Sequence, residues 1–556
     1  MNRNANSHFA VNPTNLDIGR SRFETPFNHT LTGQFAELIP FFWTEILPGD
    51  TLTIDDSKVI RMTTLLDPVF GNAFCDTYYF FVPMRLVWSH TKEFFGENTT
   101  GPWAPSTTYT IPQISFTATP ALMTVADYMG IPQANGFTVS ALPFRAYTKI
   151  YMDWFMDQNT MTPPALSLGD STVTYSWSRS DLGGTPYKAA KYHDYFTSAL
   201  PAPQRGSAVL IPFTGSGTVS ISGSFPVTAS GSIHSMGNAI QLAKGSDTTG
   251  ENLVLSNGTI SGSPREIGLV SGTLSGYTDI TKSNLVTAVS GSGSVSGISS
   301  TTSVNDLRMA FQLQKWYERS AMFGGRYIEM IKAQFGVTSP DARLQRSEYL
   351  GGNRVPLSIQ SVENTNGNTG TGAQPLGKLG AYSHTSDANH AFTHSFTEHG
   401  FVIGITCCRY LHQYPQGLNR AWSRQTMFDF YFPVFANLGN QAIKSKEIYL
   451  DGSSADDNVF GYSEAWAEYR YMPDRVSGMM RPGVSGSLAS WNFSDYYTSR
   501  PTLSSGWIVE DKSPIDRALA VPSSGSVPQL LMDIGVNCTW VRAMPLYSIP
   551  GLIDHH

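Results

Sequence analysis

The densest group of titratable side chains in this sequence lies between His384 and His412. Its members are His384, His390, His394, Glu398, His399 and His412. In an extended segment every second side chain points to the same face, so His390, His394 and Glu398 would lie together, and imidazole and carboxylate groups bind zinc. The spacing is looser than in a metal motif, and the segment leads directly into an apolar run. We therefore predict buried or interfacial hydrogen bonds and no metal site. A second interpretation is a pH-sensitive contact between subunits, because imidazole gains its charge at about pH 6.

Two acidic segments are further candidates for ion binding or catalysis. Asp451–Asn458 reads DGSSADDN, which is similar to a calcium loop, but its glycine stands at the second position rather than the sixth and no glutamate closes the ring. It is more typical of a solvated turn, and we interpret Asp55–Asp56 as a turn or the edge of a strand. No paired carboxylates indicate glycoside hydrolysis, and Walker A, HExxH, CxxC and GxSxG motifs are absent. The sequence predicts neither catalytic residues nor a cofactor.

Aromatic residues interleaved with arginine are candidates for contact with single-stranded DNA, because bases stack on aromatic rings. One such group is Arg409, Tyr410 and Tyr414, and another is Tyr469–Tyr471. In a chain with 25 Tyr and 31 Phe such neighbours arise by chance, so packing in the core is the favoured interpretation. The residues that face DNA cannot be identified from the sequence.

The charge balance argues against a protein that coats nucleic acid. The formal net charge is −6, and no run of Lys or Arg appears. Binding by release of counterions needs clustered cations that face phosphate. Within residues 1–30, only Arg3, Arg20 and Arg22 stand against Asp17 and Glu24. If the protein encloses DNA, another component must supply most of the neutralising charge.

The cysteines and the N-terminal residues indicate the cellular compartment in which the protein is made. Cys75, Cys407, Cys408 and Cys538 are too few for a disulfide framework and stand in apolar surroundings, so we expect small core residues in a reducing compartment. The adjacent Cys407 and Cys408 would point to opposite faces of a strand. Residues 1–15 show no apolar core of a signal peptide, and no apolar run reaches the roughly 18 residues of a membrane span. We expect a soluble protein made in the cytoplasm, without membrane insertion.

Length and patterning favour a large, mainly β protein. The chain has 556 residues, 50 Gly and 33 Pro, which indicates many turns and either several domains or large insertions. Ile534–Val541 alternates apolar and polar side chains as a half-buried strand does, and Thr51–Asp55 does so more weakly. Phe74–Val82 and Phe401–Leu411 are apolar on both faces, as in strands covered by a second layer. Pairing of strands so far apart in sequence is typical of a sandwich with Greek-key connections.

Three helices are predicted between these strands. Apolar side chains recur at helical spacing over Tyr147–Phe155, over Met309–Phe323 and over Ile328–Phe335. Ser303 or Asn305 would cap the second helix. We interpret all three as insertions in the β framework that pack across it or against neighbouring subunits.

The composition changes between residues 207 and 302. Gly, Ser, Thr and Val dominate there, as in GSGTVSISGSF. Such a composition is typical of a flexible linker, but Val and Ile alternating with Ser and Thr also suit strands with little core, such as a self-associating projection. Both interpretations stay open. We divide the chain into a discontinuous core, residues 1–206 and 303–556, and an insertion, residues 207–302.

The most specific motif is Phe335–Gly352, which reads FGVTSPDARLQRSEYLGG. Gly336 would end the preceding helix, since glycine adopts the left-handed conformation freely. The following loop carries Asp341, Arg343 and Arg346 in a chain that is only 14% charged, which fits either solvated surface or charge-assisted hydrogen bonds at a subunit boundary. The motif resembles a signature of the major capsid protein of gokushoviruses, small single-stranded DNA phages of the microvirus family. Further blocks resemble the same family in order: LPGDT (47–51), YFFVPMRLVW (79–88), LPFRAYTKIYMDWFMDQN (142–159), HDYFTSALPAPQRG (193–206), FTEHGFVIG (396–404), QGLNRAWSR (416–424), VFGYSEAWAEYRY (459–471) and MPLYSIPGLID (544–554).

The resemblance implies a structural protein and not an enzyme. It implies an eight-stranded antiparallel jelly roll, the capsid type of β-sandwich, with long inserted loops that contain helices. Copies would form pentamers and then a T=1 icosahedral shell around a circular single-stranded DNA genome, assembled in the cytoplasm of a host bacterium. The implied partners are other copies of the chain, the genome, a small basic DNA-binding protein, an internal scaffolding protein, a pilot protein and a host surface receptor. In the family a large, variable insertion forms protrusions at the three-fold axes. Residues 207–302 stand at its place and are therefore a candidate for host attachment.

Two other classes of protein stay open on the residues alone. A secreted carbohydrate-binding or adhesin protein would share jelly-roll strands and a Ser/Thr/Gly-rich region, but the signal peptide is missing. A β-sandwich enzyme would need an acid–base pair in a cleft, and none is visible. The ordered family blocks favour the coat protein over both.

Overall fold

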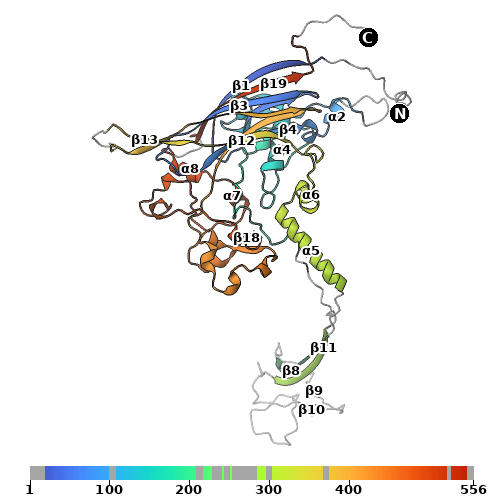
Figure 1. Cartoon of the computed structure of the whole chain (residues 1–556). Helices are drawn as coiled ribbons and strands as arrows, with labels where there is room; N and C mark the ends of the chain where they lie inside the picture. The colour runs from blue at the N-terminus through green and yellow to red at the C-terminus, as the bar shows by residue number, and fades with distance from the viewer. Residues whose placement is uncertain are drawn as a thin grey trace, which may run out of the picture. The chain divides into compact units, whose positions relative to one another are not determined.

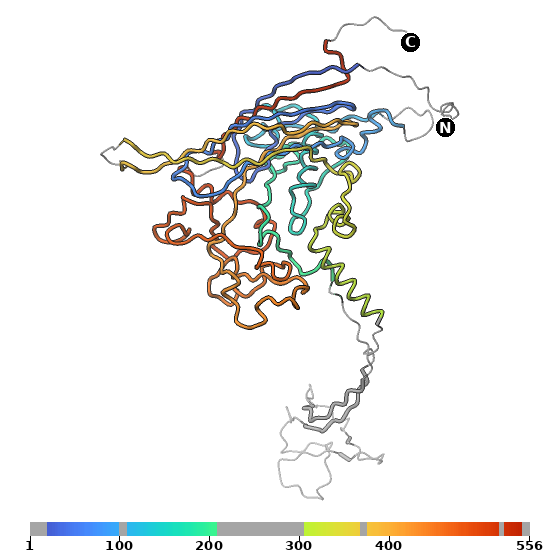
Figure 2. Tube along the Cα trace, in the orientation of Figure 1, coloured from blue at the N-terminus to red at the C-terminus, as the bar shows by residue number. Residues whose placement is uncertain are grey.

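The computed structural model describes residues 19–98, 108–207, 209, 304–366, 375–521 and 527–547, with the backbone of strands at 217–227, 241–242, 251–252 and 285–295. The chain divides into two compact units, one made of Met1–Ala208 and Gln314–His556 and the other of Val209–Leu313. Figures 1 and 2 trace the larger unit from its blue N-terminal strands to its red C-terminal strand. In the described part of the chain, no helix has the length and hydropathy needed to span a bilayer.

One four-stranded antiparallel sheet brings strands from opposite ends of the sequence together. Its order is β1 (Ser21–Gly33), β19 (Leu530–Arg542), β3 (Thr51–Met62) and β15 (Thr385–Ser395). Along β19, buried positions alternate with more exposed ones, which confirms the half-buried strand predicted for this part of the sequence. The blue and red strands lie side by side in Figure 1. This sheet has one face in the core and the other toward the surface.

The two central strands of the second four-stranded sheet are buried on both faces. Its order is β12 (Glu348–Pro356), β4 (Ala73–Pro83), β16 (Gly400–Tyr410) and β2 (Ile39–Ile46). Nearly every residue of β4 and β16 is buried, as predicted for these two runs. Cys408 belongs to the core between the sheets and Cys407 to the core on the opposite face, so the two cysteines point in opposite directions. Both are buried and unbridged, as are Cys75 and Cys538.

The two sheets enclose a common apolar core, as in a β-sandwich. Phe41 of β2, Tyr79 of β4 and Phe392 of β15 meet there. The ring centroid of Tyr79 lies 5.8 Å from that of Phe41 and 5.6 Å from that of Phe392. Because these rings come from both sheets, their burial stabilises the packing of one sheet on the other, by roughly 2–3 kcal/mol for each fully buried side chain. The protein is mainly β, as predicted.

Asp56 lies inside β3, so the interpretation of Asp55–Asp56 as a turn or strand edge is wrong. Its carboxylate is buried and accepts a hydrogen bond from the hydroxyl of Tyr79 at 3.1 Å. The ammonium of Lys58 stands 3.9 Å away. Burial raises the pKa of Asp56, while Lys58 and Tyr79 act in the opposite direction. A buried carboxylate is tolerated in the middle of a strand because both partners come from the same sandwich.

The two glycines that end the Phe335–Gly352 motif allow β12 to approach its neighbours closely. A Cβ at Gly352 would collide with the backbone oxygen of Thr77 in β4. A Cβ at Gly351 would collide with the backbone oxygen of Ala391 in β15. The motif therefore contains residues that the sandwich needs at its edge.

The first predicted helix covers the outer face of the second sheet. Helix α4 (Leu142–Ile150) is almost entirely buried and continues as one π-helical turn, η2 (Tyr151–Phe155). Their apolar side chains join β4 and β16 in a second core cluster. The predicted stripe over Tyr147–Phe155 is thus confirmed, and the wider final turn is an addition that the sequence did not predict.

The other two predicted helices are α5 (Val304–Phe323) and α6 (Tyr327–Phe335). Gly336 ends α6 with a φ of 69°, and its N–H donates to the carbonyl of Lys332, as predicted. Asn305 lies inside α5 and is therefore not its N-cap, whereas Ser303 is outside the described residues. Large apolar side chains of both helices are exposed, among them Trp316, Phe323 and Phe335.

Residues 411–521 form a lobe that we call the C-terminal lobe, drawn in orange and red in Figure 2. It consists mainly of loops and 3₁₀ turns, with the short strands β17 (Gln441–Lys444) and β18 (Val459–Ser463) and the short helices α7 (Ser505–Ile508) and α8 (Ser513–Ala518). Its apolar cluster includes Ile443, Ile448 and Trp507. A third core thus lies outside the sandwich.

Two antiparallel strand pairs are described in the smaller unit. β8 (Gly217–Val227) pairs with β11 (Leu285–Val295), and β9 (Gln241–Leu242) pairs with β10 (Glu251–Asn252). These pairs agree with the strand interpretation of the Ser/Thr/Val alternation. The rest of 207–302, apart from residues 207 and 209, lies outside the described residues, so the choice between strands and a linker stays open there.

Candidate assembly surface

The loop that follows Gly336 is anchored to the π-helical turn through Asp153. One carboxylate oxygen of Asp153 accepts hydrogen bonds from the backbone N–H and the hydroxyl of Ser347, both at 2.9 Å. The other oxygen accepts from Lys149 at 2.9 Å. The guanidinium of Arg346 donates to the backbone oxygen of Asp153 at 2.6 Å and stacks 3.8 Å above the Trp154 ring. Asp153 and Trp154, both in η2, thus hold this loop in place.

This loop thus forms charge-assisted hydrogen bonds, one of the two interpretations that the sequence left open, and the bonds that the structure describes lie within one chain. Arg346 stands 3.7 Å from Asp341 of the same loop. Burial raises the pKa of Asp341 and lowers that of Arg346. A place at a subunit boundary stays a prediction, with Arg343 as the exposed charge of this loop.

The histidine-rich segment does not form one cluster. A bulge between His390 and Phe392 shifts the register of β15 against β3. His390 is therefore paired with the outward-facing Asp55, whereas His394 is paired with the buried Leu52. The expectation that His390 and His394 share a face is wrong, because an inserted residue reverses the alternation of a strand.

The remaining members of that segment have separate partners. His390 Nδ1 lies 2.7 Å from Asp55, while Glu398, beyond the end of β15, forms an ion pair with Arg85 at 2.6 Å. His399 stacks on a phenylalanine with a centroid distance of 3.9 Å. Among the described residues, no three His, Cys, Asp or Glu side chains are placed to hold a metal ion.

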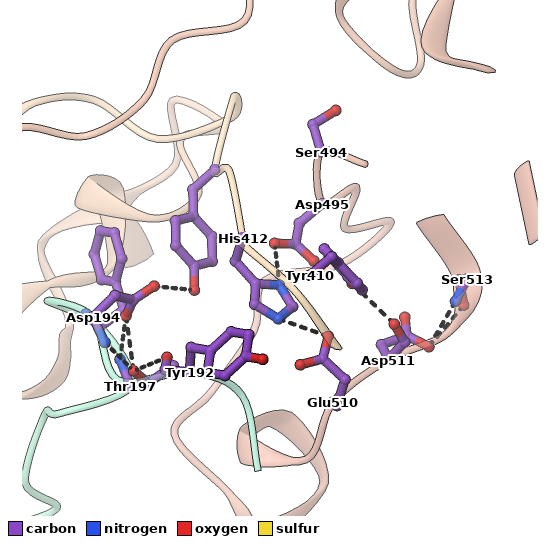
Figure 3. A network of polar contacts seen from close by, with 12 residues as sticks. Tyr192, Asp194, Thr197, Tyr410, His412, Ser494, Asp495, Glu510, Asp511 and Ser513 are labelled. Carbon is purple, nitrogen blue, oxygen red and sulfur yellow. Dashed lines mark hydrogen bonds and ion pairs between the residues drawn. The ribbon is translucent and has the colours of Figure 1, made fainter. Parts of the chain in front are cut away.

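His412 is the member of this segment with the most unusual environment. Figure 3 shows its ring between two carboxylates, with Nδ1 2.8 Å from Asp495 and Nε2 2.9 Å from Glu510. All three side chains are almost completely buried. Burial alone would lower the pKa of His412, but the two carboxylates raise it to about 9. His412 therefore joins three segments of the chain, and the two carboxylates favour its protonated form.

The acidic segment Asp451–Asn458 is closed by an arginine and is more than the solvated turn that the sequence predicted. The guanidinium of Arg500 donates to Asp451 at 2.7 Å and to Asp456 at 2.6 Å. Asp456 is buried, which a solvated turn would not produce. The positive charge that these carboxylates require comes from the chain itself.

The arginine–aromatic groups are mostly part of the interior. Arg409 donates to Asp76 at 2.6 Å, and Tyr410 and Tyr414 are buried, so the packing interpretation is confirmed for this group. In the second group, Tyr471 stacks on a buried tyrosine at 5.1 Å. Tyr469 is half exposed and faces the guanidinium of an arginine.

Among the described residues, the largest group of exposed apolar side chains that are close together in the sequence lies on the C-terminal lobe. We call this group the Phe428 surface. Its members are Trp422, Met427, Phe428, Phe430, Tyr431, Phe432, Val434, Leu438 and Tyr469. Val434 is 88% exposed and Trp422 is 79% exposed, which is unusual for side chains of this size. Between residues 422 and 438 the charged side chains are those of Arg424 and Asp429.

Sequence reasoning did not identify this surface. The run MFDFYFPVF is apolar but has neither the alternation of a strand nor the period of a helix. This lack of periodicity was the one sign in the sequence that the run could be an exposed apolar loop. A cavity of about 270 Å³ lies beside the start of the segment, lined by Arg420, Trp422, Glu468 and Tyr471 among others. The surface is therefore both apolar and uneven.

Two comparisons with known proteins both find capsid proteins. The model of the family described as capsid protein (F protein) matches residues 12–552. The capsid protein VP1 of Spiroplasma virus 4 is 37% identical over 557 residues, covering 96% of both chains. Those of Bdellovibrio phage phiMH2K and Chlamydia phage 1 are 37% and 36% identical, each covering 98% of both chains. These matches confirm the resemblance to gokushovirus capsid proteins.

Proposed function

Because this chain belongs to the capsid protein (F protein) family, a family of structural proteins and not of enzymes, we propose that it is the major coat subunit of a T=1 icosahedral shell around a circular single-stranded DNA genome. The observation that carries this proposal is the extent of the match, which covers residues 12–552 and therefore reaches the sandwich, the C-terminal lobe and the smaller unit. A role as a capsid component places the protein in the virion. Assembly of the shell in the cytoplasm of a host bacterium is part of the proposal.

We further propose that the two sheets form an eight-stranded jelly roll. The orders β1-β19-β3-β15 and β12-β4-β16-β2 support this, because the first four strands alternate between the two sheets as the chain proceeds. The last strand returns to lie beside the first, as in a Greek key. A closed set of strands of this kind leaves its connecting loops free to carry insertions.

The insertion at 207–302 is proposed as a surface protrusion at the three-fold axes that contributes to host attachment, with 1–206 and 303–556 as the core. The separate unit Val209–Leu313 supports this division. Particles that lack the insertion should assemble but adsorb poorly to the host. Normal adsorption of such particles would refute the role in attachment.

The proposed partners are those that the family resemblance implies, and the charge of the chain supports one of them. The net charge is −6, and many arginines of the described residues are paired to carboxylates, which supports a separate source of positive charge for the genome. A small basic DNA-binding protein would supply it, and an internal scaffolding protein and a pilot protein would complete the assembly.

The first test is the mass of the purified protein in solution, with electron microscopy of the same sample. Five-copy capsomers or closed shells would support the proposal, since icosahedral shells contain five-fold contacts. If the protein is monomeric, the scaffolding partner is added. A monomer that persists even then would contradict the coat function and favour a carbohydrate-binding or adhesin module.

A further inference from the structure

The Phe428 surface is larger than the apolar patches usual on a monomer. Its nine side chains are between 39% and 88% exposed. If each presents ~200 Å² when fully accessible, the exposed area of these side chains is roughly 1,100 Å². The largest patch of a typical monomer measures roughly 300–600 Å². A stable protein–protein contact buries about 800 Å² on each partner, so this surface alone has the required size.

The surface is also held in one conformation before any partner binds. Asp429 accepts hydrogen bonds from the backbone N–H of Thr426 at 2.7 Å and of Gln425 at 3.0 Å, which closes the turn that presents Phe428. These bonds lower the pKa of Asp429 to about 2. The segment is therefore preorganised, which reduces the entropy lost on binding.

A second set of contacts joins the segment to the rest of the lobe. The indole N–H of Trp466 donates to the backbone oxygen of Phe435 at 2.9 Å. The ring of Tyr431 packs edge-on against that of Trp466 at 5.8 Å and lies 6.2 Å from that of Tyr469. These contacts fix the backbone that displays the apolar side chains.

The charged side chains of the Phe428 surface indicate which kind of partner binds there. Asp429 is bonded within its own turn, and Arg424 lies 3.4 Å from Glu468, so the surface has no free cation for phosphate. These side chains therefore offer no partner for the phosphates of the genome, and phosphate contacts supply most of the affinity for nucleic acid. Aromatic residues and methionine without charge are typical of the centre of permanent contacts between identical subunits. A second copy that presents the same surface brings only charges that are already paired, so the contact buries no unpaired charge.

We propose that the Phe428 surface is a contact with a second copy of this chain in the assembled shell. This inference rests on the proposed coat function and adds to it the part of the subunit that makes the contact. Trp422 and the cavity beside it lie at one margin of the surface. The contact surface is therefore uneven as well as large.

The first experiment tests assembly. The double variant Phe428→Asp with Val434→Asp introduces charges at two exposed positions and leaves Asp429 in place, so the subunit should fold with an unchanged circular dichroism spectrum. We expect at least a tenfold fall in the yield of shells formed with the scaffolding partner. Leu122→Asp is the matched control, since Leu122 is 70% exposed and lies outside the surface. Normal shells from the folded double variant would overturn the inference.

The second experiment identifies the occupant directly. Because all four native cysteines are buried, Val434→Cys provides one accessible thiol for a benzophenone photo-crosslinker. Equal amounts of ¹⁵N-labelled and unlabelled subunits are assembled, irradiated and digested. Crosslinked peptides with mixed isotopes would support contact between two copies. Crosslinks within one chain only, or only to the scaffolding protein, would overturn the inference. If the wild-type protein forms no shells at all, the coat function itself fails, so the two failures are distinguishable.

Discussion

The β-sandwich and the C-terminal lobe are held together by different interactions. In the sandwich, regular ladders satisfy the backbone and aromatic side chains such as Tyr79 fill the space between two sheets. In the lobe, residues 411–521 contain no long strands. Charged side chains there form hydrogen bonds with backbone groups that a β-sheet would otherwise pair. Arg517, for example, donates to the backbone oxygens of Ala489, Asn492 and Ser494.

This difference teaches how an irregular segment can be rigid enough to display apolar side chains. Buried backbone groups need partners, and in the lobe arginine and histidine provide them or neutralise the carboxylates that do. Arg500 closes the acidic loop, and His412 joins Asp495 to Glu510. Beside the Phe428 surface, Arg420 and Arg424 pair with Glu468 in the same way.

The largest expected effect is loss of the cation in the lobe. His412→Gln would remove the cation that contacts both buried carboxylates, Asp495 and Glu510, which we expect to cost about 3–5 kcal/mol of the free energy of unfolding. The exposed pair between His390 and Asp55 is the control in the sandwich, where His390→Gln should cost less than ~1 kcal/mol. Urea unfolding of the unassembled subunit measures both. Equal losses from the two variants would contradict the assignment of ionic support to the lobe.

A smaller effect is expected from pH, again confined to the lobe. The pKa of His412 is about 9 in the folded protein against an ordinary value of 6.5, so the protonated form stabilises the fold fully below pH 6.5 and this contribution is lost as the pH rises to about 9. The loss amounts to roughly 3 kcal/mol. Burial also raises the pKa of Glu510, which acts in the same direction.

Thermal unfolding between pH 6 and 9.5 checks this expectation. The melting temperature should fall across that window in the wild-type protein and change much less in His412→Gln. If the variant retains the full pH dependence, another group is responsible and His412 does not carry the charge.

The same comparison explains what the sequence could predict. The strands at 74–82, 401–411 and 534–541 were found because alternation or continuous apolar character is a local pattern that burial imposes. His412 and Asp495 are 83 residues apart, and nothing in the local sequence of either one indicates the other. The bulge in β15 has no local signal in HAFTHS, which is why the faces of His390 and His394 were assigned wrongly. Exposure of the run around Phe428 depends on the packing of the whole lobe and is equally invisible to periodicity.

The smallest change in the free energy of unfolding is expected from a substitution on the outer face of the first sheet. It tests whether the stability of the sandwich comes mainly from the buried face of that sheet. The hydroxyls of Thr53 and Thr393 are 3.0 Å apart on neighbouring strands and exposed, so Thr393→Ala should change the free energy of unfolding by less than ~0.5 kcal/mol. Ile54 points to the opposite, buried face, and Ile54→Ala should cost about 2–5 kcal/mol. Urea unfolding of the two variants gives the ratio. A loss from Thr393→Ala that approached that from Ile54→Ala would mean that polar pairs stabilise the sandwich as they do the lobe, and the contrast between the two regions would then be one of geometry and not of forces.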